Sequence, residues 1–117
     1  MAKTSVWKSV ERELARLLGG ERVPVTGRAR GNAPDIRHPY LAIEVKHRKM
    51  LPEWLHDAMR QAVASVRGLQ LPIVILHQSR SRHDDDFVVI RMSDFRAWMV
   101  SERKEKHADN TEDEKTD

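Results

Sequence analysis

The sequence predicts an α/β fold, in which helices pack against β-strands. Two stretches, residues 5–18 and 52–67, carry apolar side chains at the spacing of amphipathic helices. Residues 41–45 alternate apolar and polar positions as a half-buried strand does. Residues 73–76 form a continuous apolar run of strand length, and residues 87–91, apolar up to Ile90, indicate another strand. Helical and strand patterns therefore both occur along the same chain.

The first predicted helix begins at a capping residue, Thr4 or Ser5, and ends at two consecutive glycines. Its apolar face consists of Val6, Trp7, Val10, Leu14, Leu17 and Leu18. On a helical wheel, Glu11 lies at the margin of that face, so its carboxylate can reach over the edge of the core. The alternative is a surface carboxylate that pairs with Arg12 or Arg16.

A first strand is predicted at residues 22–25, and the proline at position 24 places it near an edge or a bulge. The following residues 26–33 form a loop rich in glycine and arginine. Arg28 and Arg30 of this loop can contact a phosphate backbone. The alternative is a flexible loop that carries incidental charge.

The strand predicted at residues 41–46 is the most informative one, because its side chains alternate between two faces. The apolar face carries Leu41, Ile43 and Val45. Packing of that face fixes the register and leaves Glu44 and Lys46 as neighbours on the other face. Asp35 is expected to end a preceding short strand, with a turn at residues 37–40, so that its carboxylate lies beside Glu44.

Two carboxylates brought together repel each other, and a divalent cation such as Mg²⁺ relieves that repulsion. A nearby lysine can then position or deprotonate a water molecule bound to the cation. Asp35, Glu44 and Lys46 therefore predict metal-dependent phosphodiester hydrolysis, in which the cation activates the nucleophile and offsets the charge of the transition state.

The second half of the chain continues the alternation of helix and strand. Pro52 opens a helix that Gly68 ends, and its buried stripe consists of Leu55, Met59, Ala62, Val63 and Val66. Residues 73–76 predict a strand covered on both faces, and residues 87–91 predict another strand. Ser93 can cap a last short helix with apolar contacts from Phe95, Trp98 and Met99.

Pro34-Asp35 followed by Glu44-Val45-Lys46 resembles the signature of the PD-(D/E)XK nuclease superfamily. This resemblance implies a restriction-endonuclease-like core with the order αβββαβ, in which helices flank a central mixed β-sheet. The predicted elements follow that order along the chain.

A narrower resemblance is to the archaeal-type Holliday junction resolvases. Val10-Glu11-Arg12 is similar to an element of their first helix whose glutamate is associated with the metal. Thr26-Gly27 is similar to a hydroxyl residue and glycine in their mobile loop, with threonine in place of the more typical serine. Gln61 is the candidate for a glutamine found on the following helix. The segments that build the resolvase dimer have no clear counterpart here.

The resemblance implies a Mg²⁺-dependent endodeoxyribonuclease, with Mn²⁺ as the other candidate ion, that acts as a homodimer on four-way or branched DNA in recombination or repair. Glu11, Asp35, Glu44 and the backbone carbonyl of Val45 would be the metal ligands, and Lys46 would orient the attacking water. Thr26 and Gln61 would complete the catalytic residues. The alternatives are a general or restriction-like nuclease and a non-catalytic DNA-binding module of the same fold.

Basic charge gathers around the motif. The basic residues between positions 22 and 49 are Arg22, Arg28, Arg30, Arg37, Lys46, Arg48 and Lys49, against two acidic ones. Such a cluster predicts phosphate binding, whereas the alternative is an ordinary solvated surface. The candidates for DNA contacts are Arg28, Arg30, Arg37, Arg48 and Lys49.

Length and composition limit the number of domains and the class of protein. A chain of 117 residues suffices for one domain, expected at residues 1–100, followed by a disordered charged tail at residues 101–117. Without that tail the chain has seventeen basic and eleven acidic residues, a net charge of +6. There is no long apolar segment and no hydrophobic leader, which predicts a soluble cytoplasmic protein without a membrane partner.

Two further groups of residues are predicted to have no metal-binding role. The histidines at positions 38, 47, 56, 77 and 83 show no regular ligand spacing, which argues against a histidine metal site. The acidic residues 84–86 are adjacent in sequence and are expected to be solvated loop charges. The absence of cysteine excludes disulfides and thiolate metal sites.

Overall fold

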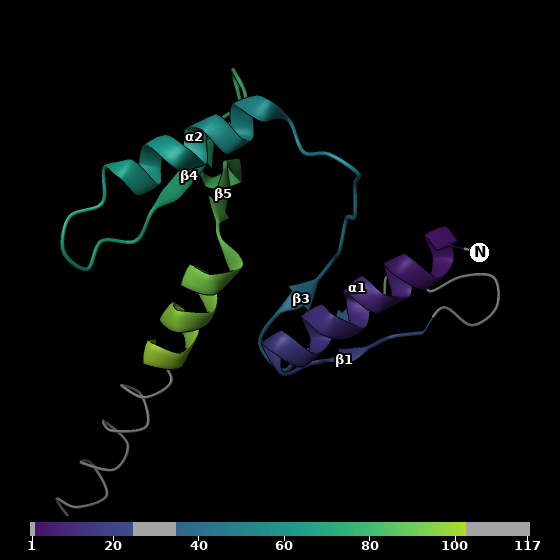
Figure 1. Ribbon diagram of the computed structural model, residues 1–117. Coiled ribbons are helices and arrows are strands. Elements are labelled where there is room, and N and C mark those ends of the chain that lie inside the picture. Colours follow the sequence, from purple (N-terminus) through teal and green to yellow (C-terminus); the bar gives the residue numbers. More distant parts are fainter. Residues whose placement is uncertain (1, 25–34, 103–117) are drawn as a thin grey trace, which may run out of the picture. The chain divides into compact units, whose positions relative to one another are not determined.

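The computed structural model describes residues 2–24 and 35–102, with side chains from residue 6 onwards (Figure 1). The chain divides into two compact units, Met1–Met50 and Leu51–Asp117. The prediction of one domain over residues 1–100 stays a prediction. The loop at residues 26–33 and nearly all of the expected tail lie outside the described residues.

The first unit combines one helix with a three-stranded antiparallel sheet in the order β1-β2-β3 (Figure 1). Its elements are α1 (Ala2–Leu18), β1 (Glu21–Arg22), β2 (Ile36–Arg37) and β3 (Ala42–Ile43). In the middle strand, Ile36 pairs with Arg22 on one side and with Ile43 on the other. The helix α1 packs against β1 and β2.

Apolar side chains from α1, β2 and the segment after β3 form the core of the first unit. Its buried members are Ala15, Ile36 and Val45, and the partly buried Val10, Leu14 and Ile43 pack against them. Val6 and Trp7, which were expected on the buried face, are exposed. That prediction is wrong because the helix begins at Ala2 and the side chains of α1 that pack in the core start only at Val10. For the same reason neither Thr4 nor Ser5 is the N-cap.

Two glycines connect α1 to β1, as the sequence predicted. Gly19 has a φ of +75°, a left-handed conformation that glycine adopts without a steric penalty and that commonly ends a helix. Gly20 lies against β2, because a Cβ atom at this position would be 2.6 Å from the carbonyl oxygen of Arg37 and 2.8 Å from Cγ2 of Ile36. The absence of a side chain at position 20 therefore lets the chain turn closely over the middle strand.

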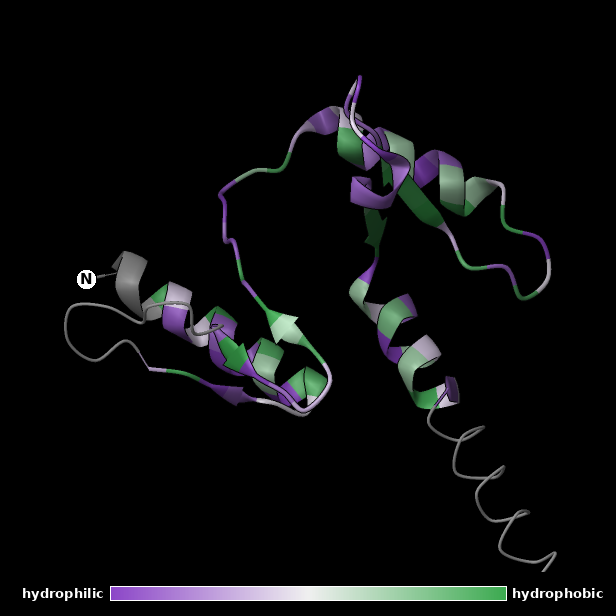
Figure 2. Ribbon diagram, turned by 180° about the vertical axis from the view of Figure 1, so that it is seen from behind, coloured by the Kyte–Doolittle hydropathy of each residue, from purple (hydrophilic) through white to green (hydrophobic). Residues whose placement is uncertain are grey.

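The second unit contains two helices, a short 3₁₀ helix and a two-stranded antiparallel sheet (Figure 1). Its elements are α2 (Glu53–Ala64), β4 (Ile73–Leu76), η1 (His83–Asp85), β5 (Phe87–Ile90) and a helix at residues 92–102. The paired strands carry strongly hydrophobic residues (Figure 2), and α2 packs against β4. The last helix already includes residue 93, so Ser93 is not its cap, and the helix continues to residue 102 beyond the expected start of the tail.

One face of the sheet in the second unit is covered more than the other face. Val74 and Leu76 are half-buried, whereas Ile73 and Ile75 are exposed. The expectation that β4 is covered on both faces is therefore wrong within the second unit. The sheet has two strands, and the helix α2 that packs against β4 covers one of its faces.

The α/β class predicted from the sequence is confirmed, since helices and antiparallel strands occur in both units. The strands of the described residues lie in two small antiparallel sheets, and no parallel pair of the expected mixed sheet occurs among them. No helix in the described part of the chain has the length and apolar character needed to cross a membrane.

Candidate active site

Glu11 and Asp35, two of the predicted site residues, are the buried charged side chains of the described residues. Glu11 is 1% exposed and Asp35 is 3% exposed. Burial of a carboxylate costs free energy unless hydrogen bonds or an ion pair compensate for the lost hydration. The groups around Glu11 and Asp35 must therefore compensate for the lost hydration of the two carboxylates.

Glu11 points from α1 into the unit and forms an ion pair with Arg22 of β1. The Arg22 Nε atom donates to the Glu11 Oε2 atom at 2.7 Å. The surface pairing with Arg12 or Arg16 is thus not the observed arrangement, and Arg16 pairs instead with the exposed Glu13. The position of Glu11 at the margin of the apolar face brings it to the sheet, as the helical wheel predicted.

Asp35 directly precedes β2, and hydrogen bonds hold it against β3 and the segment that follows it. Its backbone N–H donates to the carbonyl of Ile43 at 2.9 Å. Its carboxylate accepts the backbone N–H of Val45 at 2.5 Å. Asp35 therefore bridges the residues on either side of Glu44, which brings the two halves of the sequence motif together.

The strand position expected for Asp35 needs correction. We expected this residue to end a strand, whereas β2 begins immediately after it, at Ile36. The physical reason is the packing of Ile36, which is fully buried and paired on both sides. The turn is correspondingly shifted, since Arg37 belongs to β2.

Glu44 and Lys46 lie on the solvent-facing side of the same segment. The Lys46 Nζ atom is 3.3 Å from the Glu44 Oε1 atom, and the side chains are 69% and 60% exposed. Between them Val45 is buried in the core. The predicted alternation over residues 41–46 is confirmed by the burial pattern, although the regular strand covers only Ala42–Ile43.

The three predicted acidic ligands do not form a tight cluster in this structure. In the described part of the chain, one group of at least three histidine or acidic side chains has ligand atoms within 4.8 Å of one another, and it does not include Glu11, Asp35 or Glu44. Glu11 is engaged with Arg22, Asp35 with the backbone of Val45, and Glu44 with Lys46.

The remaining candidates are distributed over both units. Arg37, Arg48 and Lys49 are exposed in the first unit, as phosphate contacts would need to be. Gln61 is an exposed residue of α2 in the second unit. Thr26, Arg28 and Arg30 lie outside the described residues.

The sequence interpretation missed two groups of residues. Arg22 was counted among the basic residues, and its partnership with Glu11 had no local signature because eleven positions separate the two. The group of ligand-type side chains in the described residues is His77, His83 and Asp86, from the second unit. Histidine spacing alone did not indicate it, because a hairpin and a 3₁₀ turn bring the three residues together.

The first unit thus combines a buried carboxylate, an exposed carboxylate, an exposed ammonium group and a second buried carboxylate paired with arginine. Carboxylate oxygens are the ligands that Mg²⁺ and Mn²⁺ prefer, and a lysine near them suits the handling of a water nucleophile. In comparisons with known proteins, no family model, no curated protein and no solved structure matches this chain.

Proposed function

We propose that this chain is a divalent-metal-dependent DNA endonuclease with a restriction-endonuclease-like core, related to the PD-(D/E)XK nucleases. The observation that carries the proposal is the position of Asp35, whose buried carboxylate accepts the N–H of Val45 between Glu44 and Lys46. This contact holds a buried carboxylate against the segment that carries an exposed carboxylate and an amine, which are the residue types that a metal-dependent nuclease site uses.

The donor atoms of this site fit Mg²⁺ or Mn²⁺, because these ions accept oxygen ligands and need few protein carboxylates. Asp35, Glu44 and the backbone carbonyl of Val45 would hold the ion, and Glu11 would contribute directly or through a water molecule. A bound ion would supply polarisation of the phosphoryl oxygen and a lower pKa for the attacking water. Lys46 would orient that water, since its ammonium group is exposed beside Glu44.

The preferred substrate in this proposal is branched DNA, with a four-way junction as its most specific form. Exposed Arg37, Arg48 and Lys49 would contact phosphates, together with Arg28 and Arg30. Thr26 would act near the scissile phosphate, whereas the role of Gln61, a residue of the second unit, stays a prediction. Paired cuts on opposed strands need two active sites, so the active form would be a homodimer.

A panel of matched linear, nicked, flap and four-way DNA substrates, incubated with Mg²⁺ or Mn²⁺, tests this function. We expect paired cuts near the branch point of the four-way substrate and no cleavage when the divalent ion is chelated. The substitution Asp35→Asn keeps an oxygen that can accept the N–H of Val45 but removes the charge. This variant and Lys46→Ala should reduce cleavage at least about a hundredfold while DNA binding remains.

Lys8→Ala is the matched control, because Lys8 is an exposed lysine of the same unit outside the proposed site. It should cleave as the unaltered protein does. Retained cleavage in both Asp35→Asn and Lys46→Ala would contradict the proposal. Cuts in every duplex, abolished by the same substitutions, would identify a general or restriction-like nuclease.

A non-catalytic DNA-binding module is the second candidate function. It is favoured by the ion pair between Glu11 and Arg22, which already satisfies one proposed ligand, and by the lack of a tight cluster of Glu11, Asp35 and Glu44. Binding of the DNA substrates without cleavage, in the presence of either Mg²⁺ or Mn²⁺, would support the DNA-binding module.

A further inference from the structure

A second cluster of charged and ligand-type side chains lies in the second unit, at the end of the sheet where a loop joins β4 to β5. The His77 Nδ1 atom is 2.6 Å from the Asp86 Oδ1 atom, and the His83 Nδ1 atom is 3.1 Å from the Asp86 Oδ2 atom. The two imidazole rings are tilted by 34°, with centroids 4.7 Å apart. One carboxylate is therefore shared by two imidazoles.

The convergence of these residues follows from the pairing of the two strands. Leu76 pairs with Phe87 in the antiparallel sheet, so His77 and Asp86 occupy the next opposed positions. The 3₁₀ turn η1 begins at His83, and the N–H of Asp86 donates to the carbonyl of His83 at 3.0 Å. The hairpin and the turn thus place three side chains at one point.

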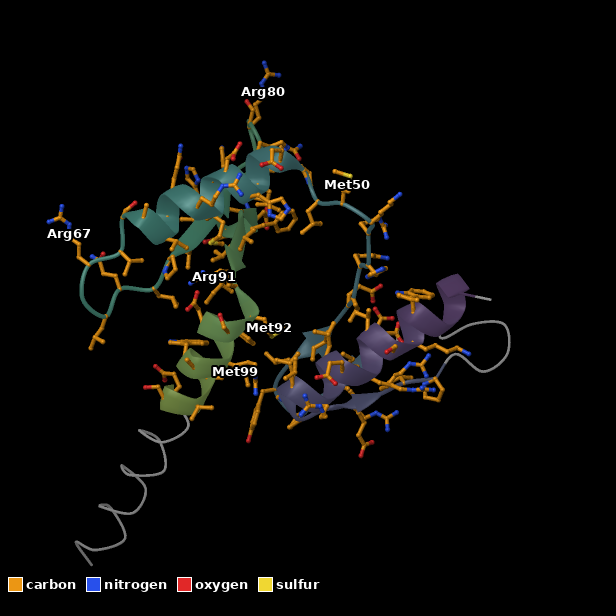
Figure 3. The ribbon with its side chains drawn as sticks, in the orientation of Figure 1. Met50, Arg67, Arg80, Arg91, Met92 and Met99 are labelled. Atoms are coloured by element: carbon orange, nitrogen blue, oxygen red, sulfur yellow. The ribbon has the colours of Figure 1, made fainter. Side chains whose placement is uncertain are left out.

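The nearby basic side chains leave this point accessible to a cation. Arg80 lies at the tip of the loop between β4 and β5 and points away from the unit (Figure 3). Arg82 is engaged with the exposed Asp85. Asp86 has an 11% exposed side chain, whereas the side chain of His83 is 86% exposed, so the cluster opens to solvent on the His83 side.

We propose that His77, His83 and Asp86 form a binding site for a divalent transition-metal ion of zinc-like chemistry. Imidazole nitrogen together with one carboxylate is a donor set that Zn²⁺ and Co²⁺ accept, whereas Mg²⁺ prefers oxygen ligands. Three protein ligands leave one position of a tetrahedral ion for water, and the exposure of His83 provides access for it.

The observed distances are close to those that such an ion requires. Ligand atoms about 2.0–2.1 Å from a tetrahedral ion lie about 3.3 Å from each other. One ligand atom from each of His77, His83 and Asp86 lies within 4.8 Å of the others, so each separation would change by at most about 1.5 Å, which rotation of the side chains can provide.

Charge balance also favours a cation over two protonated rings. Protonation of both imidazoles would place two positive charges close together with one carboxylate to compensate for them. A divalent ion instead binds two neutral imidazoles and the ionised carboxylate.

The proposed ion would link the end of β4 to the start of β5 through His77 and Asp86. Closing this loop would stabilise the hairpin, because the ion binds the folded unit and not the extended chain. The site is independent of the proposed nuclease site, since its ligands all belong to the second unit.

Titration of the full chain with Co²⁺, in the presence of excess Mg²⁺ to occupy oxygen-rich sites, tests the proposal. We expect one Co²⁺ per chain, the visible absorption of a four-coordinate ion, and its loss when Zn²⁺ displaces Co²⁺. Zn²⁺ should also increase hydrogen-exchange protection in β4 and β5. His83→Ala and Asp86→Asn should each weaken binding at least about tenfold.

Two control variants make the outcome decisive. His56→Ala removes an exposed histidine of α2 in the same unit and should leave Co²⁺ binding unchanged. Asp35→Asn should also retain the Co²⁺ spectrum, which distinguishes this site from the proposed nuclease site. The absence of Co²⁺ binding in the unaltered chain, its loss in Asp35→Asn, or unchanged binding in both His83→Ala and Asp86→Asn would overturn the proposal. His83 is exposed, so unchanged far-UV circular dichroism should show that its variant folds.

Discussion

At the scale of single residues, Glu11 illustrates how a charged side chain acquires a defined place in a small core. Its position on the helix follows from the sequence, because it lies at the margin of the apolar face. Its partner does not, because Arg22 belongs to a strand after the two glycines. Helical periodicity predicts the direction of a side chain, whereas the identity of a distant partner depends on how the chain turns back.

Replacement of Glu11 by alanine should destabilise the first unit, because Arg22 would lose its compensating charge while staying largely buried. We expect a loss of about 3 kcal/mol, at the lower end of the effect of breaking a buried pair, because Arg22 retains some contact with solvent. Urea unfolding measures this loss. Glu11→Met combined with Arg22→Met should recover part of it, since the two apolar side chains remove both charges.

Glu13→Ala is the matched control on the same helix. Glu13 is exposed and pairs with Arg16, an interaction that lowers the pKa of Glu13 but is screened by solvent. Its removal should leave the unfolding midpoint unchanged. Equal effects of Glu11→Ala and Glu13→Ala would contradict the structural importance of the buried pair.

Gly20→Ala should also destabilise the first unit, for a steric reason. A methyl group would be 2.6 Å from the Arg37 carbonyl oxygen, which belongs to the backbone and cannot rotate away. We expect a loss of about 1–3 kcal/mol, the usual cost of overpacking. Hydrogen exchange at the amides of β2 measures it.

Gly19→Asn provides the comparison for Gly20→Ala. A side chain at position 19 meets open space, and asparagine tolerates the left-handed conformation with φ near +75°. The protection of β2 should therefore stay close to that of the unaltered protein. A larger loss for Gly19→Asn than for Gly20→Ala would show that the close approach to β2 is unimportant.

At the scale of elements, the helices and the apolar strands of the second unit were predictable, and the short strands of the first unit were predictable only in part. The alternation over residues 41–46 indicated the correct buried face. Regular pairing covers only two residues per strand in this sheet, because its length depends on contacts with β1 and β2 that no local pattern encodes. The predicted ends of these strands were therefore wrong, whereas the predicted orientation of the Glu44 and Lys46 side chains toward solvent was right.

Ile36→Ala tests the importance of the middle strand. Ile36 is fully buried, pairs with both neighbouring strands and belongs to the core cluster with Ala15 and Val45. Its truncation should cost about 3 kcal/mol, because it removes apolar contacts and leaves a cavity. Hydrogen exchange of peptides from both units should show the loss in the first unit.

Ile73→Ala is the corresponding truncation in the second unit. Ile73 is 40% exposed, so the same change of side chain should cost no more than about 1 kcal/mol. A greater loss of protection from Ile73→Ala than from Ile36→Ala would contradict the assignment of the core of the first unit.

The histidine cluster shows why sequence spacing can fail at the scale of elements. His77 and His83 lie six positions apart, and Asp86 follows three positions later. This spacing matches no helix face. Convergence requires the register Leu76 with Phe87 and the turn at η1, both of which are tertiary features. Such a site can be found only after the hairpin is placed.

At the scale of the whole molecule, the distribution of charge would determine how the chain binds DNA in the proposed function. Residues 1–100 carry a net charge of +6, whereas the chain as a whole carries +3. The charge of the first unit near the motif includes the exposed neighbours Arg48 and Lys49. Phosphate contacts release counterions, so the salt dependence of binding reports how many such contacts a surface makes.

The double substitution Arg48→Ala and Lys49→Ala should weaken binding to linear and four-way DNA alike, because phosphate contacts do not depend on sequence. We expect the slope of log K against log salt concentration to fall by about 2, close to one unit for each lost phosphate contact. Fluorescence anisotropy with labelled duplexes at several salt concentrations measures both quantities.

Arg67→Ala combined with Arg80→Ala is the control for that prediction, because it removes the same charge from the second unit. Both arginines are exposed and extend from loops, as Figure 3 shows. If binding depended only on net charge, the two double variants would lose the same affinity and slope. If the basic cluster beside the motif makes the phosphate contacts, Arg48→Ala with Lys49→Ala should lose clearly more of both. Equal losses would assign DNA binding to overall charge and remove the cluster from the proposed interface.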